Sequence, residues 1–154
     1  MSARISDIKK ELENKSRQEI LEYCLRLGKF KKENKEFLSF LLFEAEDINA
    51  YIEKVNGETT NFFGEINLSN VYFIKKSIRK IVRNMNKHIR FTASAQTEAE
   101  ILIHFCNCFE RNSLHQKKSR QLENIFISQV KKAEVALSSL HPDLQYDLQQ
   151  KKDF

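Results

Sequence analysis

The chain has 154 residues, a net charge of +5 from 26 basic and 21 acidic side chains, and only three Gly and one Pro. So little turn-forming material disfavours a multi-stranded sheet, and three cysteines without the spacing of a disulfide framework indicate a reducing compartment. The longest apolar run, residues 37–43, is interrupted by Ser39 and is far shorter than the roughly 20 residues of a membrane span. We therefore expect a cytoplasmic protein without a transmembrane helix.

Apolar residues at helical spacing predict three helices in the first part of the chain. The first covers about residues 6–13. The second starts at a capping box, Ser16-Arg17-Gln18-Glu19, in which the Ser and Glu side chains each bond a backbone amide of the first turn. The third, about residues 35–43 with Asn34 as its cap, is apolar nearly all round, so we expect it to be buried or to cover a neighbour.

The next segment, Glu44 to Glu65, is acidic, with a net charge of −5. Its first half predicts a helix over Ala45 to Val55. Asn56-Gly57 is expected to end that helix and to begin a loop of about ten residues. Asn67 or Ser69 then caps the helix that follows.

This following helix, Ile66 to about Phe91, holds all of the net positive charge. Residues 66–97 contain seven basic and no acidic side chains, whereas residues 1–65 sum to −2 and residues 98–154 to zero. On a helical wheel the seven cations fall within roughly 140°, and seven apolar residues fall within roughly 100° on the opposite side. The apolar set is Val71, Ile74, Ile78, Ile81, Val82, Met85 and Ile89.

Two further helices and a tail complete the chain. A second capping box, Thr97-Glu98-Ala99-Glu100, predicts a helix to about Asn112, and a last long helix runs from His115 or Lys117 to Leu140. Pro142 interrupts the pattern, and residues 143–154 are expected to form a loose tail. The prediction is an all-α fold with one domain over residues 1–154: a bundle or short superhelix of about seven helices, stacked as antiparallel pairs around the basic helix.

Three short stretches resemble a family of short all-helical bacterial proteins of uncharacterised function. They are Ser6-x-Ile8-Lys9-Lys10-Glu11-Leu12, Ser16-x-x-Glu19-Ile20-Leu21 and Lys32-Glu33-Asn34-Lys35-Glu36-Phe37-Leu38. The similarity is clearest over residues 5–45. It implies stacked antiparallel helix pairs and brings no catalytic or binding residue with it.

Two groups of residues suggest chemistry. Glu19-x-x-Glu22 and Glu44-x-x-Asp47 resemble the carboxylate pairs with which all-helical nucleotide pyrophosphohydrolases hold Mg²⁺, so such an enzyme is one alternative. His104-x-Cys106-x-Cys108 contains metal-ligand types, but only His104 and Cys108 share a helix face, which favours core packing. We expect no catalytic residue, metal or cofactor.

The basic face is therefore the candidate site. It consists of Lys75, Lys76, Arg79, Lys80, Arg83, Lys87 and Arg90. We expect a non-enzymatic interaction or scaffold module that accepts an acidic protein on this face. Binding of nucleic acid without sequence specificity is an alternative, and pairing with the chain's own acidic segment is another. A homodimer is also expected, and it stays open whether a second subunit covers the apolar helix around Phe40.

Overall fold

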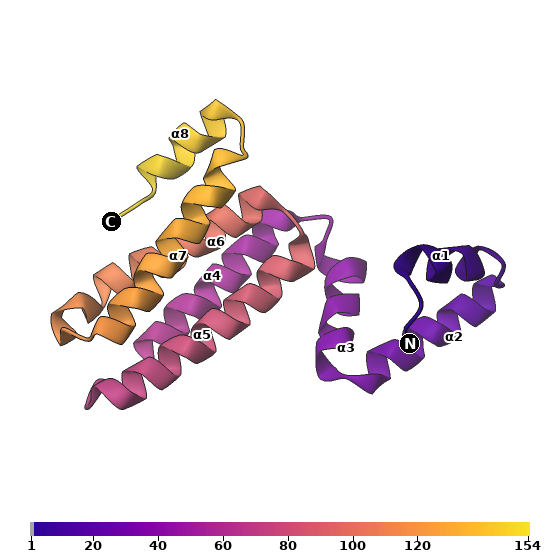
Figure 1. The fold of residues 1–154 in the computed structure, drawn as a ribbon, viewed down its shortest axis with the longest axis horizontal. Coiled ribbons are helices and arrows are strands. Elements are labelled where there is room, and N and C mark those ends of the chain that lie inside the picture. The colour runs from indigo at the N-terminus through magenta and orange to yellow at the C-terminus, as the bar shows by residue number, and fades with distance from the viewer. Residues whose placement is uncertain (1) are drawn as a thin grey trace. The chain divides into compact units, whose positions relative to one another are not determined.

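The structure is a computed structural model that describes residues 2–154, and it confirms the all-α fold: no strand occurs in this range. Within residues 2–154 the chain forms eight α-helices. Figure 1 shows their order along the chain. No helix within residues 2–154 is long and apolar enough to cross a bilayer. The helices are α1 (Ile5–Glu13), α2 (Arg17–Phe30), α3 (Lys32–Ser39), α4 (Ile48–Gly64), α5 (Val71–Thr92), α6 (Ala95–Arg111), α7 (Arg120–Ser138) and α8 (Pro142–Gln150), with a π-helical turn at Phe40–Glu44 and a 3-10 turn at Leu114–Lys117.

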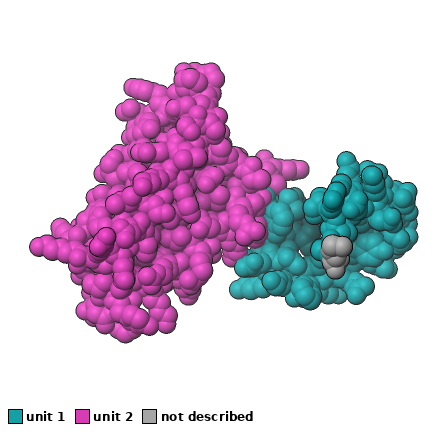
Figure 2. Space-filling model, in the orientation of Figure 1, with its two compact units in different colours: residues 1–44 teal, residues 45–154 magenta. Residues whose placement is uncertain are grey.

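The helices form two compact units, residues 1–44 and 45–154, where the sequence predicted a single domain (Figure 2). The first unit holds α1 to α3 and the π-helical turn, and the second holds α4 to α8. We describe each unit by itself.

In the first unit α2 and α3 form a helical hairpin around Gly28. A Cβ atom built on Gly28 would lie 2.9 Å from Cδ1 of Leu38, so the absence of a side chain permits the close approach of the two helices. The capping box at Ser16 is confirmed, since its hydroxyl accepts from the Glu19 amide at 3.1 Å. The predicted cap at Asn34 is wrong: Asn34 lies inside α3, and its side-chain amide donates to the Leu27 carbonyl at 2.7 Å, which ties the hairpin together.

In the second unit α4 continues through Asn56-Gly57 to Gly64, so the predicted loop after residue 57 is wrong. The reason lies in the buried face. Val55, Thr59 and Phe63 follow one another at helical spacing and are all buried, and this burial outweighs the cost of about 1 kcal/mol for a helical Gly. Asp47 caps the start of α4 by accepting from the Ala50 amide at 3.1 Å.

The basic helix is α5, and it begins later than predicted because Asn70, not Asn67 or Ser69, is its cap. The Asn70 side chain accepts from the Phe73 amide at 3.0 Å. Ala93 ends the helix in the left-handed conformation, with φ of 48°. Only Ala93 and Ser94 then separate α5 from α6, so the two helices run antiparallel as neighbours (Figure 1).

The centre of this unit is α6. The sequence pattern had predicted α5 instead. Ten residues of α6 are buried, among them the completely enclosed Phe105 and Phe109, and α4, α5 and α7 all pack on it. A helix that is apolar nearly all round is stable only when it is covered on every side. Its cap is Ser94, which accepts from the Thr97 amide at 3.3 Å, so the predicted capping box at Thr97 is wrong.

The C-terminal residues are ordered, in contrast to the loose tail expected for residues 143–154. Pro142 occupies the first turn of α8, where its missing amide hydrogen costs nothing. Asn107 of α6 then holds the end of the chain: its side-chain amide donates to the Lys151 carbonyl at 2.8 Å, and its side-chain oxygen accepts from the Asp153 amide at 2.8 Å. These two bonds fix residues 151–153 against α6.

Candidate functional site

The apolar side of α5 lies where the helical wheel places it. Ile74, Ile78, Ile81 and Met85 are buried, and Val71, Val82 and Ile89 are half-buried. Because this stripe is committed to the core, the opposite side of α5, with the seven cations, must face outward.

The outward side exposes five of the seven predicted cations. Lys75 and Lys87 are half-buried, and Lys75 donates to the side-chain carbonyl of Gln121 on α7. None of the five exposed cations forms an ion pair with a carboxylate within residues 2–154. The five are Lys76, Arg79, Lys80, Arg83 and Arg90.

The acidic segment lies beside α5, but its contacts are at one edge of the basic face. Glu58 of α4 pairs with the His88 ring at 3.8 Å, and His88 is also hydrogen-bonded to the buried Tyr51. Glu65 and Lys80 line one cavity of about 220 Å³ between α4 and α5 without forming an ion pair. Arg79, Arg83 and their exposed neighbours are therefore not neutralised by the acidic segment.

At the other edge a groove of about 400 Å³ runs between α5 and α7. Val82 and Ile125 give it an apolar lining, and Arg79 and Arg83 line it from α5. Gln129 of α7 also lines it; this side chain is 4% exposed, and its Oε1 has no hydrogen-bond partner within residues 2–154. The groove thus combines positive charge, apolar surface and an unused acceptor.

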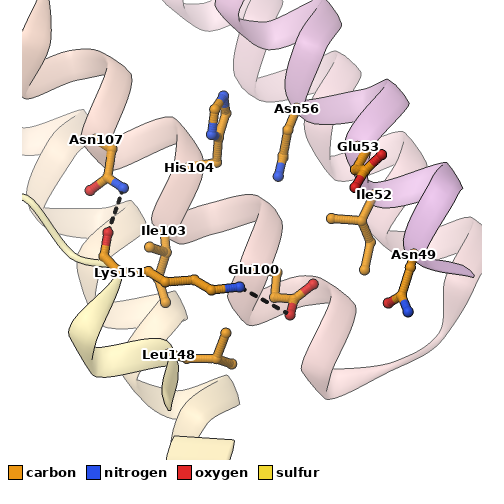
Figure 3. A pocket seen from close by; sticks show the side chains of 10 residues that line it. All are labelled: Asn49, Ile52, Glu53, Asn56, Glu100, Ile103, His104, Asn107, Leu148 and Lys151. Atoms are coloured by element: carbon orange, nitrogen blue, oxygen red, sulfur yellow. Dashed lines mark hydrogen bonds and ion pairs between the residues drawn. The ribbon is translucent and has the colours of Figure 1, made fainter. Parts of the chain in front are cut away.

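A polar cavity of about 390 Å³ lies between α4, α6 and α8 (Figure 3). Lys151 reaches across it toward Glu100, with 4.0 Å between Nζ and Oε1. Its lining is mostly amide and charged side chains: Asn49, Glu53, Asn56, Glu100, His104, Asn107 and Lys151, together with Ile52, Ile103 and Leu148. Such a lining can hydrogen-bond a small polar molecule.

Sequence reasoning missed the polar cavity, although both α4 and α6 carry a signal of it. Asn49, Glu53 and Asn56 repeat at i, i+4 and i+7 on α4, and Glu100, His104 and Asn107 repeat in the same way on α6. Residues so spaced share a helix face. The sequence does not show that these two faces pack together, because the whole of α5 separates α4 from α6 along the chain.

The chain was also compared with known proteins. No protein-family model, curated protein or solved structure matches it. The similarity of residues 5–45 to uncharacterised helical bacterial proteins thus stays a prediction, and the site is interpreted from its geometry.

Neither of the two groups of residues that suggested chemistry forms a metal site within residues 2–154. Within residues 2–154 no group of three or more His, Cys, Asp or Glu side chains is placed to hold a metal ion. Glu19 serves its helix cap, accepting from the Ser16 amide at 3.4 Å. Residues two apart on α6 point in different directions, which separates Cys106 from the pair formed by His104 and Cys108.

His104 and Cys108 do lie together, as their spacing predicted, with 3.5 Å between Nε2 and Sγ. Thr60 of α4 is hydrogen-bonded to His104 at 2.8 Å. Burial lowers the pKa of His104 and raises the pKa of Cys108, so both are neutral near pH 7. A reactive cysteine needs the thiolate, and this pair therefore stabilises the contact between α4 and α6 without forming a nucleophile.

Thiol reactivity tests this conclusion. Burial raises the pKa of Cys106 to about 12, and Cys106 and Cys108 are both buried, whereas Cys24 is half-buried. We expect a thiol reagent at pH 7.5 to modify at most one of the three cysteines of the native protein rapidly, and all three after denaturation. Rapid modification of Cys108 in the native protein, located by peptide mass spectrometry, would contradict this.

Proposed function

We propose that the protein is a non-enzymatic interaction module that accepts an acidic protein segment on the outward side of α5. The observation that carries the proposal is that five cations of one helix are exposed and have no carboxylate partner within residues 2–154. Positive charge concentrated on one face raises the rate of encounter with acidic partners and rejects basic ones.

The groove between α5 and α7 favours a partner whose acidic part is an amphipathic helix. Arg79 and Arg83 are one turn apart, so they match carboxylates that are also one turn apart on the partner. Arginine forms planar two-bond contacts with carboxylates. An apolar partner side chain can then enter the groove and lie on Val82 and Ile125, which gives contact area that charge alone does not.

The apolar lining also favours protein over nucleic acid. Proteins that grip single strands combine cations with several aromatic side chains on which bases stack. Here Tyr72 is the one aromatic side chain among the cations on the wheel, and it lies at the start of α5.

The three free cysteines support a reducing location such as the cytoplasm.

Charge reversal tests the proposal. The triple variant Arg79→Glu, Lys80→Glu, Arg83→Glu should bind a fluorescein-labelled amphipathic peptide, with Glu on one face and Leu on the other, at least about 100-fold more weakly than the original protein. The measurement is fluorescence anisotropy at moderate salt. Stability should change by less than about 1 kcal/mol, because all three side chains are exposed.

A matched variant tests whether the position of the charge change matters, and not only the change in net charge. Lys9→Glu, Lys10→Glu, Lys15→Glu makes the same change in net charge at exposed positions of the first unit, and its affinity for the peptide should stay within about threefold of the original. Equal weakening by both variants refutes a site on α5. Tight binding of a labelled DNA duplex at moderate salt, without binding of the peptide, replaces the proposal with the nucleic-acid alternative.

A further inference from the structure

The polar cavity between α4, α6 and α8 has more negative than positive charge in its lining. Among the residues described, Glu53 and Glu100 are its two carboxylates and Lys151 is its one cation. His104 also lines it, but burial lowers the pKa of this ring, so the ring is neutral near pH 7. The excess carboxylate repels an anion and attracts a cation. The lining therefore favours a positively charged molecule.

Both carboxylates lack a hydrogen-bonded cation among residues 2–154. Glu53 forms no ion pair in this range. The side chain of Glu100 is 17% exposed, and the ammonium group of Lys151 lies 4.0 Å from it, beyond the roughly 2.7–2.9 Å of a charged hydrogen bond. Lys151 is itself 63% exposed, so water screens this pair. A closely bound donor would stabilise Glu100, because this carboxylate is largely removed from water.

Asn56 adds a third acceptor without a donor. Its side-chain amide faces the cavity from α4 (Figure 3), and its buried Oδ1 has no hydrogen-bond partner within residues 2–154. Asn56 follows Glu53 by three residues, so the two share a face of α4. The terminal torsion of Asn is soft, which lets the oxygen turn toward a donor in the cavity. The acceptors of the wall thus call for a molecule rich in N–H donors.

Apolar side chains complete the wall. Ile52, Ile103 and Leu148 line the cavity and are themselves buried, so they offer a surface on which a hydrocarbon chain can lie. The volume of about 390 Å³ is in the range of small-molecule sites. A metal ion would leave the apolar surface unused, whereas a small organic cation uses both parts of the wall.

We propose that this cavity binds a short aliphatic diamine. One ammonium group lies beside Glu53 on α4 and the other beside Glu100 on α6, which Figure 3 shows at separate places on the wall. Each ammonium group has three N–H donors, so one of them can also serve Asn56. Lys151 reaches across the cavity toward Glu100, and the bound amine replaces it there. The site is separate from the basic side of α5, because none of the seven cations lines it.

Calorimetric titration of the full chain with three molecules of similar length tests the charge preference. 1,4-Diaminobutane should bind with a dissociation constant below about 1 mM, at least about tenfold more tightly than 4-aminobutyrate, and succinate should not bind measurably. Absence of diamine binding at about 10 mM overturns the site. Binding of 4-aminobutyrate or succinate as tight as that of the diamine overturns the cationic ligand.

Neutral substitutions of the carboxylates locate the site. Glu53→Gln and Glu100→Gln should each raise the dissociation constant of 1,4-diaminobutane about tenfold or more, with unchanged helical circular dichroism. Glu134→Gln makes the same change in charge at an exposed position of α7 outside the cavity, and should leave the constant within about twofold. Equal effects of all three substitutions overturn binding in this cavity.

Lys151→Ala tests the competition for Glu100. The variant keeps the main-chain carbonyl that accepts from Asn107, so the end of the chain stays in place. Because it removes the ammonium group that the diamine must replace, the dissociation constant should fall about threefold or more. A constant that stays the same overturns the competition, and a constant that rises shows that Lys151 binds the ligand and overturns the cationic ligand.

Discussion

Phe105→Ala is expected to lower the free energy of unfolding by about 3–5 kcal/mol, the largest effect of any single substitution considered for this protein. Phe105 lies on α6, is completely buried, and meets the ring of Phe63 edge-on with 5.5 Å between centroids. Removing the ring leaves a cavity where α4 and α6 meet, and neighbours that are already closely packed fill it only in part. Urea unfolding followed by circular dichroism measures the loss.

The control is the same substitution at an exposed position of the same unit. Phe73 of α5 is 42% exposed, so Phe73→Ala should cost less than about 1 kcal/mol. Similar losses at the two positions would show that α6 is not the centre of the core. It would favour α5 as the centre of the core, as the sequence predicted.

His115→Gln is expected to lower the free energy of unfolding by about 2–3 kcal/mol at pH 6, and by clearly less at pH 9. His115 joins two carboxylates: Nδ1 lies 2.5 Å from Oε1 of Glu123 on α7, and Nε2 lies 2.8 Å from Oε1 of Glu110 on α6. Hydrogen bonds between charged groups contribute about 1.5–3 kcal/mol each, and partial exposure reduces this. The charged ring thus ties α6, the 3-10 turn and α7 together.

The direction of the pH dependence follows from the pKa of His115. Burial, the largest single influence, lowers this pKa, but the hydrogen bonds and charges of Glu123 and Glu110 together outweigh it, so the pKa of the folded protein is raised above 6.5. A raised pKa adds stability that is fully present below about pH 6.5 and is lost as the pH rises through the folded value. The stability difference between the original protein and His115→Gln should shrink over that range.

The carboxylates provide the control for His115. In the double variant Glu110→Gln, Glu123→Gln the ring has no anionic partner, so the part of the pH dependence of stability that His115 contributes between pH 6 and pH 9 should be lost. Unfolding in urea at each pH gives the comparison. A difference between the original protein and His115→Gln that is constant with pH would contradict a charged His115.

Local patterns were sufficient for the two sides of α5 and for the capping box at Ser16, whereas the caps predicted for α3, α5 and α6 were wrong. The apolar and basic sides of α5 follow from periodicity alone, because a helix fixes the direction of each side chain relative to its neighbours. The capping box at Ser16 was confirmed for a similar reason, since its bonds join residues three apart. The end of α4 was predicted wrongly because Asn56-Gly57 is a local stop signal, and the buried face that continues to Phe63 outweighs it.

The sequence by itself determined that this protein is all-helical and that its net positive charge lies on one side of one helix. Only the tertiary structure decided that α6 is the centre, that the acidic segment leaves Arg79 and Arg83 without carboxylate partners, and that α7 completes a groove beside them. The physical reason is the range of the interactions. Periodicity and capping act over three or four residues, whereas a core, a groove and an ion pair depend on which helices pack together.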